Sequence, residues 1–108
     1  MDVPEIDIAE ASRRHAAGAI VIDVRELSEY VEGHVPGAPL IPLSSVPERV
    51  HEVPSDGEVL VICKMGGRSR SAAAFLREQG IDAINIAGGT LAWIDAGHRV
   101  VTGEEAGS

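Results

Sequence analysis

The sequence predicts a single α/β domain organised around a mostly parallel β-sheet. Two short runs, 19–24 (AIVIDV) and 59–63 (VLVIC), consist almost entirely of consecutive apolar residues. Such runs are typical of strands that are buried on both faces of a parallel sheet. Helical patterns separate and follow these runs, and this alternation indicates the α/β class. At 108 residues the chain has room for one core but not for two ordinary domains.

The first half of the chain predicts a helix, a buried strand and a broken connection. Residues 8–17 show a helical apolar pattern that follows the capping residue Asp7 and stops at Gly18. After the first strand, repeated Gly and Pro residues interrupt residues 26–50 and prevent any long element there. The elements expected in that segment are, in order, a short helix, a short edge strand near Leu40 and a short helix over 46–50.

The last third predicts two helices around a strand. Aromatic residues make up only 3% of the chain, so Val, Ile, Leu and Ala must fill the core. We expect the domain to span residues 1–102 and the Gly-, Glu- and Ser-rich tail, 103–108, to be flexible. The expected elements are a helix over 70–79 that ends at Gly80, a strand over 83–86 and a helix over 90–96 that ends at Gly97.

Composition narrows the function classes. A formal net charge of −8 argues against nucleic acid or an anionic membrane surface as the main partner. The longest apolar runs are far shorter than the roughly 20 residues that cross a bilayer, and the acidic N-terminus is unlike a secretory signal. A single cysteine cannot form an internal disulfide, so we expect a reducing, cytoplasmic location. We also expect a monomer, as the default for a small chain, and no cofactor. We expect no metal site, because the chain has one cysteine and its histidines lack ligand spacing.

The only cysteine, Cys63, closes the second apolar run and opens the segment CKMGGRS, which leads into a helix. In open parallel sheets, reactive groups lie beyond the carboxyl ends of the strands. Consecutive backbone N–H groups, a helix N-terminus and nearby cations should lower the pKa of this thiol and make it a nucleophile. The alternative is a small buried core residue. The loop residues that would support the nucleophile include two cations and two glycines that let the backbone curl: Lys64, Gly66, Gly67 and Arg68.

The other loop side chains each have two interpretations. The basic cluster of Lys64, Arg68 and Arg70 predicts a small anionic substrate, although Lys64 is also explained as a solvated side chain. Arg68 is expected either to bind an anionic donor through two hydrogen bonds or to form a salt bridge at the helix start. Met65 either forms an apolar wall beside the reacting sulfur or fills a gap. Ser69 either caps the helix or donates its hydroxyl to the sulfur.

Three segments together resemble the landmarks of single-domain rhodanese-like sulfurtransferases: DVRELSEYVEGHVPGA at 23–38, CKMGGRS at 63–69 and NIAGGTLAWIDAG at 85–97. The resemblance extends over nearly the whole chain. It implies a five-stranded, mostly parallel sheet flanked by helices on both faces, with Cys63 at the head of a cradle-shaped loop. It also implies that Asp23 has a structural role and that His34 organises its loop. Arg25 is expected either to anchor the rim with Glu29 or to attract the donor.

The resemblance further implies a thiosulfate sulfurtransferase reaction. The Cys63 thiolate would take a sulfane sulfur from thiosulfate or a similar small anion and pass it to cyanide, a thiol or a protein. The loop from Cys63 to Arg68 has six residues, the length associated with sulfur transfer in this family, whereas phosphatases of related fold have one more. Two other functions remain open: a partner-dependent sulfur carrier or regulatory module with little thiosulfate turnover, and arsenate or phosphate ester chemistry.

Overall fold

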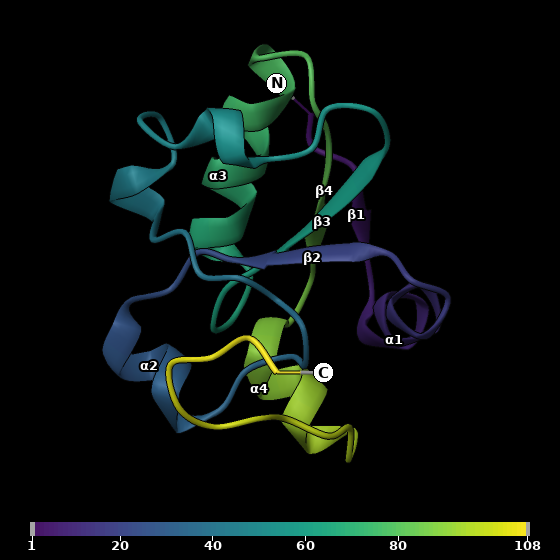
Figure 1. Ribbon diagram of the computed structural model, residues 1–108. Helices are drawn as coiled ribbons and strands as arrows, with labels where there is room; N and C mark the ends of the chain where they lie inside the picture. The colour runs from purple at the N-terminus through teal and green to yellow at the C-terminus, as the bar shows by residue number, and fades with distance from the viewer. Residues whose placement is uncertain (1, 108) are drawn as a thin grey trace.

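The protein is described by a computed structural model that covers residues 2–107. Within these residues, four strands form one sheet in the order β1-β4-β3-β2, and every neighbouring pair is parallel (Figure 1). The chain therefore has the α/β arrangement with a parallel sheet that its sequence predicted. The strands are β1 (Glu5–Ile6), β2 (Ile20–Asp23), β3 (Glu58–Ile62) and β4 (Asp82–Ile86).

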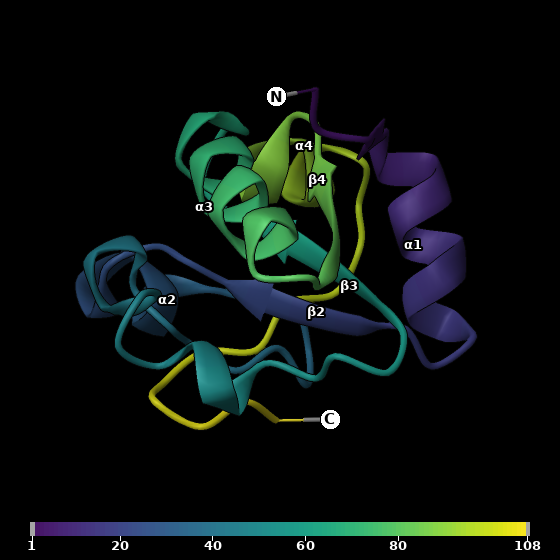
Figure 2. The same ribbon diagram turned by 90° about the horizontal axis from the view of Figure 1, so that it is seen from above.

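Helices cover both faces of this sheet. The helices are α1 (Ile8–Ala16), α2 (Leu27–Glu32), α3 (Gly67–Glu78) and α4 (Gly89–Asp95). Ala72, Ala73 and Leu76 of α3 pack in one buried cluster, whereas Ala11 of α1 and Trp93 of α4 pack in the other. Figure 2 shows α3 and α1 on opposite sides of the strands. Alternate residues of the buried strands face the two clusters, which explains their continuous apolar sequence.

The sheet has four strands, so the expectation of five was wrong. Leu40 contributes a single parallel bridge to Asp23 instead of an edge strand. At this bridge the Asp23 N–H donates to the Pro39 carbonyl and the Ile41 N–H donates to the Asp23 carbonyl. Pro39 has no N–H that could extend the ladder in one direction, and in the other direction the Leu43 N–H donates to the Val24 carbonyl, one residue out of the regular register. The two-residue strand β1, which pairs with β4, was not predicted because it is too short to show alternation.

The expected helix over 46–50 also does not form. Residues 46–49 form turns between two 3₁₀ turns, Leu43–Ser45 and Val50–Glu52. The hydrogen bonds of this segment run mainly between residues three apart, as from the Val46 N–H to the Leu43 carbonyl and from the Val53 N–H to the Val50 carbonyl, so no continuous α-helix forms. Among the described residues, no helix is both long enough and apolar enough to span a membrane.

The other boundaries agree with expectation to within three residues. The largest difference is at α3, which begins at Gly67 and not at residue 70. Gly66 precedes it with a φ of 118°, a left-handed conformation that costs glycine little. The glycines of the cysteine loop therefore already belong to the helix start, which brings the helix N-terminus closer to Cys63.

The described part of the C-terminal tail runs beside the segment that follows α2. The Gly103 N–H donates to the Val31 carbonyl at 2.9 Å, and the Gly37 N–H donates to the Ala106 carbonyl at 2.8 Å. The division of the chain into a domain over 1–102 and a flexible tail stays a prediction. These hydrogen bonds place the tail against residues 31–37, which also contribute to the rim of the candidate site described below.

Helix α4 packs directly against the backbone of the cysteine loop. The Thr90 N–H and hydroxyl both donate to the Cys63 carbonyl, at 2.8 and 3.0 Å, and the Leu91 N–H donates to the Lys64 carbonyl at 3.1 Å. Gly89 makes this approach possible, because a Cβ there would lie 2.5 Å from the Cys63 oxygen and 2.4 Å from the Lys64 oxygen. The third landmark of the sequence thus holds the second in place.

We predict that Gly89→Ala destabilises the fold far more than Gly18→Ala. Both glycines have a positive φ, so each substitution costs about 1–2 kcal/mol of backbone strain. Gly18 has open space around it, whereas an added methyl at Gly89 collides with backbone oxygens and adds about 1–3 kcal/mol. Urea unfolding of both variants measures the difference, and equal losses would contradict a close approach of α4 to the loop.

Candidate active site

Cys63 lies immediately after β3, at the carboxyl edge of the sheet, and is 1% exposed. Its sulfur accepts two hydrogen bonds, one from the Gly66 N–H at 3.1 Å and one from the Ser69 hydroxyl at 3.2 Å. The left-handed Gly66 turns the backbone so that this N–H points back toward the sulfur. The loop therefore surrounds the sulfur with donors, as the sequence predicted from its glycines and helix start.

The pKa of the Cys63 thiol is held below its ordinary value by these donors. Burial is the largest single influence, and on its own it would raise the pKa. Hydrogen bonds from the Ser69 hydroxyl and from the backbone N–H groups of Ser69, Gly66 and Met65 outweigh burial together. A larger fraction of the cysteine is consequently thiolate at neutral pH, and the thiolate is the reactive form.

Asn85 is a buried polar residue at the site that the sequence analysis did not select. Its side-chain oxygen accepts from the Ser69 hydroxyl, and its amide group donates to the Gly66 carbonyl at 3.1 Å and to Glu5 at 2.7 Å. Since a hydroxyl has one hydrogen, Ser69 serves either Asn85 or the Cys63 sulfur at a given moment. The sequence could have indicated Asn85, because it is the polar residue of the otherwise apolar strand segment AINI at 83–86.

Arg68 is paired with Glu29. Two of its guanidinium nitrogens donate to the two carboxylate oxygens, at 2.7 and 2.8 Å. The hydrogen bond from Arg68 lowers the pKa of Glu29 to about 2, so the pair persists across the neutral range. The two-bond contact that the sequence suggested for an anionic donor is thus made to a carboxylate of α2. Glu29 binds Arg68, so the anchoring of the rim by Arg25 and Glu29, one of the two roles considered for Arg25, stays a prediction.

Asp23 and Arg25 form a buried ion pair of their own. The Arg25 side chain donates to both carboxylate oxygens of Asp23, at 2.8 to 3.1 Å, and to the Gly33 carbonyl at 2.8 Å. The Arg25 backbone N–H donates to the same carboxylate at 3.0 Å. These contacts join the end of β2 to the end of α2. A structural role for Asp23 stays a prediction.

His34 is fully buried between two backbone carbonyls. Nδ1 lies 2.7 Å from the Tyr30 oxygen and Nε2 lies 2.8 Å from the Glu105 oxygen. The ring also stacks on Tyr30, with centroids 3.6 Å apart. These contacts connect α2, the following loop and the C-terminal tail.

A pocket of about 160 Å³ opens beside the cysteine loop, between α2 and α4. Lys64 contributes a cation to it, whereas Met65 is 68% exposed and points largely into solvent. Within residues 2–107, no three His, Cys, Asp or Glu side chains are grouped so that they could hold a metal ion. The pocket is lined by Arg25, Glu29, Glu32, Gly33, Lys64, Thr90, Leu91 and Ile94.

These features define a class of protein. A cysteine with a lowered thiol pKa, at the head of a loop of N–H donors on the carboxyl edge of a parallel sheet, is suited to group transfer through a covalent sulfur intermediate. The model of the rhodanese-like domain matches residues 7–96, and the chain belongs to this family, whose members include single-domain sulfurtransferases.

Comparisons with known proteins agree with this assignment. A sulfurtransferase from Allochromatium vinosum is 35% identical over 105 residues, which cover 94% of this chain and 98% of the relative. The thiosulfate sulfurtransferase GlpE from Pseudomonas entomophila is 36% identical over 85 residues, covering 78% of each chain. The crystal structure of a rhodanese-related protein from Thermoplasma volcanium superimposes with a TM-score of 0.87 at 32% identity, covering 93% of this chain and 99% of that chain.

We predict that Ser69→Ala raises the pKa of the Cys63 thiol, because the hydroxyl donates to the sulfur and stabilises the thiolate. The pH dependence of alkylation by iodoacetamide measures this pKa directly. Ser71→Ala is a matched control, because Ser71 is exposed two residues further along α3. If the pKa of Cys63 is unchanged in both variants, the Ser69 hydroxyl donates its hydrogen to Asn85 and not to the sulfur.

Proposed function

We propose that this chain is a sulfurtransferase that carries a sulfane sulfur as a persulfide on Cys63. The thiolate attacks the outer sulfur of thiosulfate or a similar donor, the S–S bond of the donor breaks, and sulfite leaves with the electron pair. A thiophilic acceptor, such as cyanide, a thiol or a protein, then attacks the outer sulfur of the persulfide. The bond to Cys63 breaks and the thiolate is restored.

The observation that carries this proposal is the ring of donors around a buried sulfur. The same donors that lower the pKa of Cys63 can stabilise the negative charge of the persulfide, since charge is on sulfur in both states. Backbone N–H groups need no rearrangement between the two states. The chain has no second cysteine, so an external acceptor must remove the sulfur.

Donor binding would depend on the cations beside the loop. Lys64 lines the pocket, is exposed and takes part in no ion pair among the described residues, so it is available to attract a small anion. Arg68 is available only where the anion shares it with Glu29 or displaces that carboxylate. Gly67 and the helix start of α3 add N–H groups at the same end of the loop.

One observation favours the second candidate function, a partner-dependent sulfur carrier. Glu29 occupies the guanidinium that would best recognise a sulfonate, and Cys63 is only 1% exposed. The pairing of Arg68 with Glu29 weakens the recognition of free thiosulfate. A protein donor that delivers its sulfur within a complex does not need this guanidinium to bind a sulfonate.

The test is intact-mass analysis of the reduced protein after incubation with thiosulfate, together with a thiosulfate-to-cyanide turnover assay. We expect the mass of one sulfur atom to be gained and thiocyanate to be formed, with both lost in Cys63→Ser. A gain of mass without turnover supports the carrier function. Absence of any gain, with thiosulfate and with inorganic polysulfide alike, would overturn the proposal that Cys63 carries sulfur.

We predict that Glu29→Gln lowers the KM for thiosulfate about three- to tenfold and changes kcat little. The substitution removes the carboxylate charge from Arg68, so an anionic donor competes with a neutral amide for the guanidinium. Glu32→Gln removes the same charge from the same pocket without touching Arg68, and it controls for the general field. Equal changes of KM in the two variants would show that Arg68 does not bind the donor.

A further inference from the structure

Three exposed apolar side chains lie around the mouth of the candidate active site. Five large apolar residues are exposed in the described chain, and Met65, Leu91 and Ile94 are three of them, at 68%, 43% and 48%. Leu91 and Ile94 line the pocket, and Met65 follows the pocket residue Lys64. A single exposed apolar side chain is ordinary, whereas a group around a reactive centre marks a contact surface.

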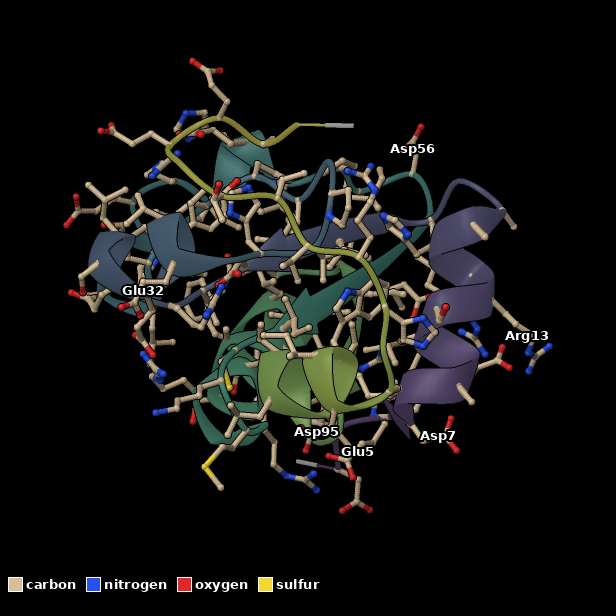
Figure 3. The ribbon with its side chains drawn as sticks, turned by 90° about the horizontal axis from the view of Figure 1, so that it is seen from below. Glu5, Asp7, Arg13, Glu32, Asp56 and Asp95 are labelled. Carbon is tan, nitrogen blue, oxygen red and sulfur yellow. The ribbon has the colours of Figure 1, made fainter. Side chains whose placement is uncertain are left out.

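The helix geometry places acidic side chains beside these apolar ones. On α4, Leu91, Ile94 and Asp95 are three and four residues apart and therefore share one face. On α2, Glu32 lines the same pocket from the other side. Figure 3 shows the face that carries both helices, with Glu32 labelled on α2 and Asp95 on α4. We call Glu32, Met65, Leu91, Ile94 and Asp95 the rim patch.

The charge balance of the rim patch is negative. Glu32 and Asp95 take part in no ion pair among the residues that the structure describes. Lys64 is a nearby cation that likewise has no ion pair among these residues. Arg25 and Arg68 are neutralised by Asp23 and Glu29. The whole chain carries a formal net charge of −8, so the wider field has the same sign. A partner that binds here must supply apolar contacts and positive charge together.

We propose that the rim patch docks a basic protein that presents a cysteine between cationic and apolar side chains, and that this cysteine is the sulfur acceptor. The inference rests on the proposed persulfide function of Cys63. The partner thiolate attacks the outer sulfur of the Cys63 persulfide, a new S–S bond forms on the partner, and the Cys63 thiolate leaves. The negative charge of the Cys63 persulfide moves to the partner with the outer sulfur, so charge and electrons balance and no external oxidant or reductant is required.

The geometry of the site is consistent with brief docking. A surface of three apolar residues and two carboxylates is small, and interfaces below about 1,200 Å² are typical of transient encounters. Charge complementarity increases the association rate more than the lifetime of a complex. A sulfur acceptor has to arrive, react and leave, so a small charged surface suits this task better than a large apolar one.

The experiment uses the full chain loaded with sulfur by inorganic polysulfide and two synthetic cysteine peptides as acceptors. Both peptides contain the same leucines beside the cysteine, and they differ only in carrying lysines or glutamates. Loss of the persulfide is followed by intact mass, and rates are compared per thiolate. We expect the lysine peptide to react about tenfold faster at low salt, with an advantage that shrinks as salt is added.

Matched variants separate the rim patch from general charge and hydrophobicity. The double change Glu32→Lys and Asp95→Lys should remove the preference for the lysine peptide, whereas Glu78→Lys, at an exposed position on α3, should retain it. Ile94→Ser should slow transfer to the lysine peptide about threefold. Ile20→Ser should not slow this transfer, because Ile20 is 40% exposed but lies at the amino end of β2, away from the carboxyl edge that carries the site.

The outcomes distinguish this inference from the function on which it rests. A protein that does not load with polysulfide overturns the persulfide function and the docking proposal with it. A protein that loads but transfers equally to both peptides overturns the docking proposal alone. Concentration-dependent dimerisation that Ile94→Ser abolishes and Ile20→Ser preserves would assign the rim patch to a second copy of this chain, and would also overturn it.

Discussion

The buried sulfur of Cys63 is the constraint on which the rest of the structure depends. Burial removes water from the thiolate and raises its pKa, so the protein must supply donors of its own. Gly66 supplies one because its left-handed backbone turns an N–H toward the sulfur, and Ser69 supplies another from the first turn of α3.

This loop is stable only because neighbouring elements hold its outer side. Thr90 and Leu91 of α4 donate to the carbonyls of Cys63 and Lys64, while the Asn85 amide donates to the carbonyl of Gly66. With these carbonyls paired on the outside, the N–H groups remain free to point inward. Parallel strands make the arrangement possible, since β3 and β4 end at the same edge and bring both segments together.

Local patterns explain which features were predictable. The strands β2, β3 and β4 are short apolar runs, and Cys63 with its glycines occupies consecutive positions, so each is visible in a single window of sequence. The pairing of Arg68 with Glu29 spans 39 positions, and the contacts of Asn85 with Ser69 and Glu5 span 16 and 80, so no local pattern indicates them. The missing fifth strand illustrates a finer limit, because the backbone hydrogen bonds around Leu40, and not an apolar run, decide whether its bridge to Asp23 extends.

The pairing of Arg68 with Glu29 changes how the charges of the site are understood. Read along the chain, Lys64, Arg68 and Arg70 form a basic cluster that faces an anion. In the folded protein Glu29 neutralises Arg68, and Glu5 binds Arg70 at 2.9 Å, so Lys64 is the cation of this cluster without an ion pair among the described residues. The positive potential at the sulfur therefore comes mainly from the Ser69 hydroxyl and the backbone N–H groups, which act over short distances. The surface beyond them is acidic and apolar, and the proposed docking of a cationic partner depends on this separation between the donors at the sulfur and the charges of the rim.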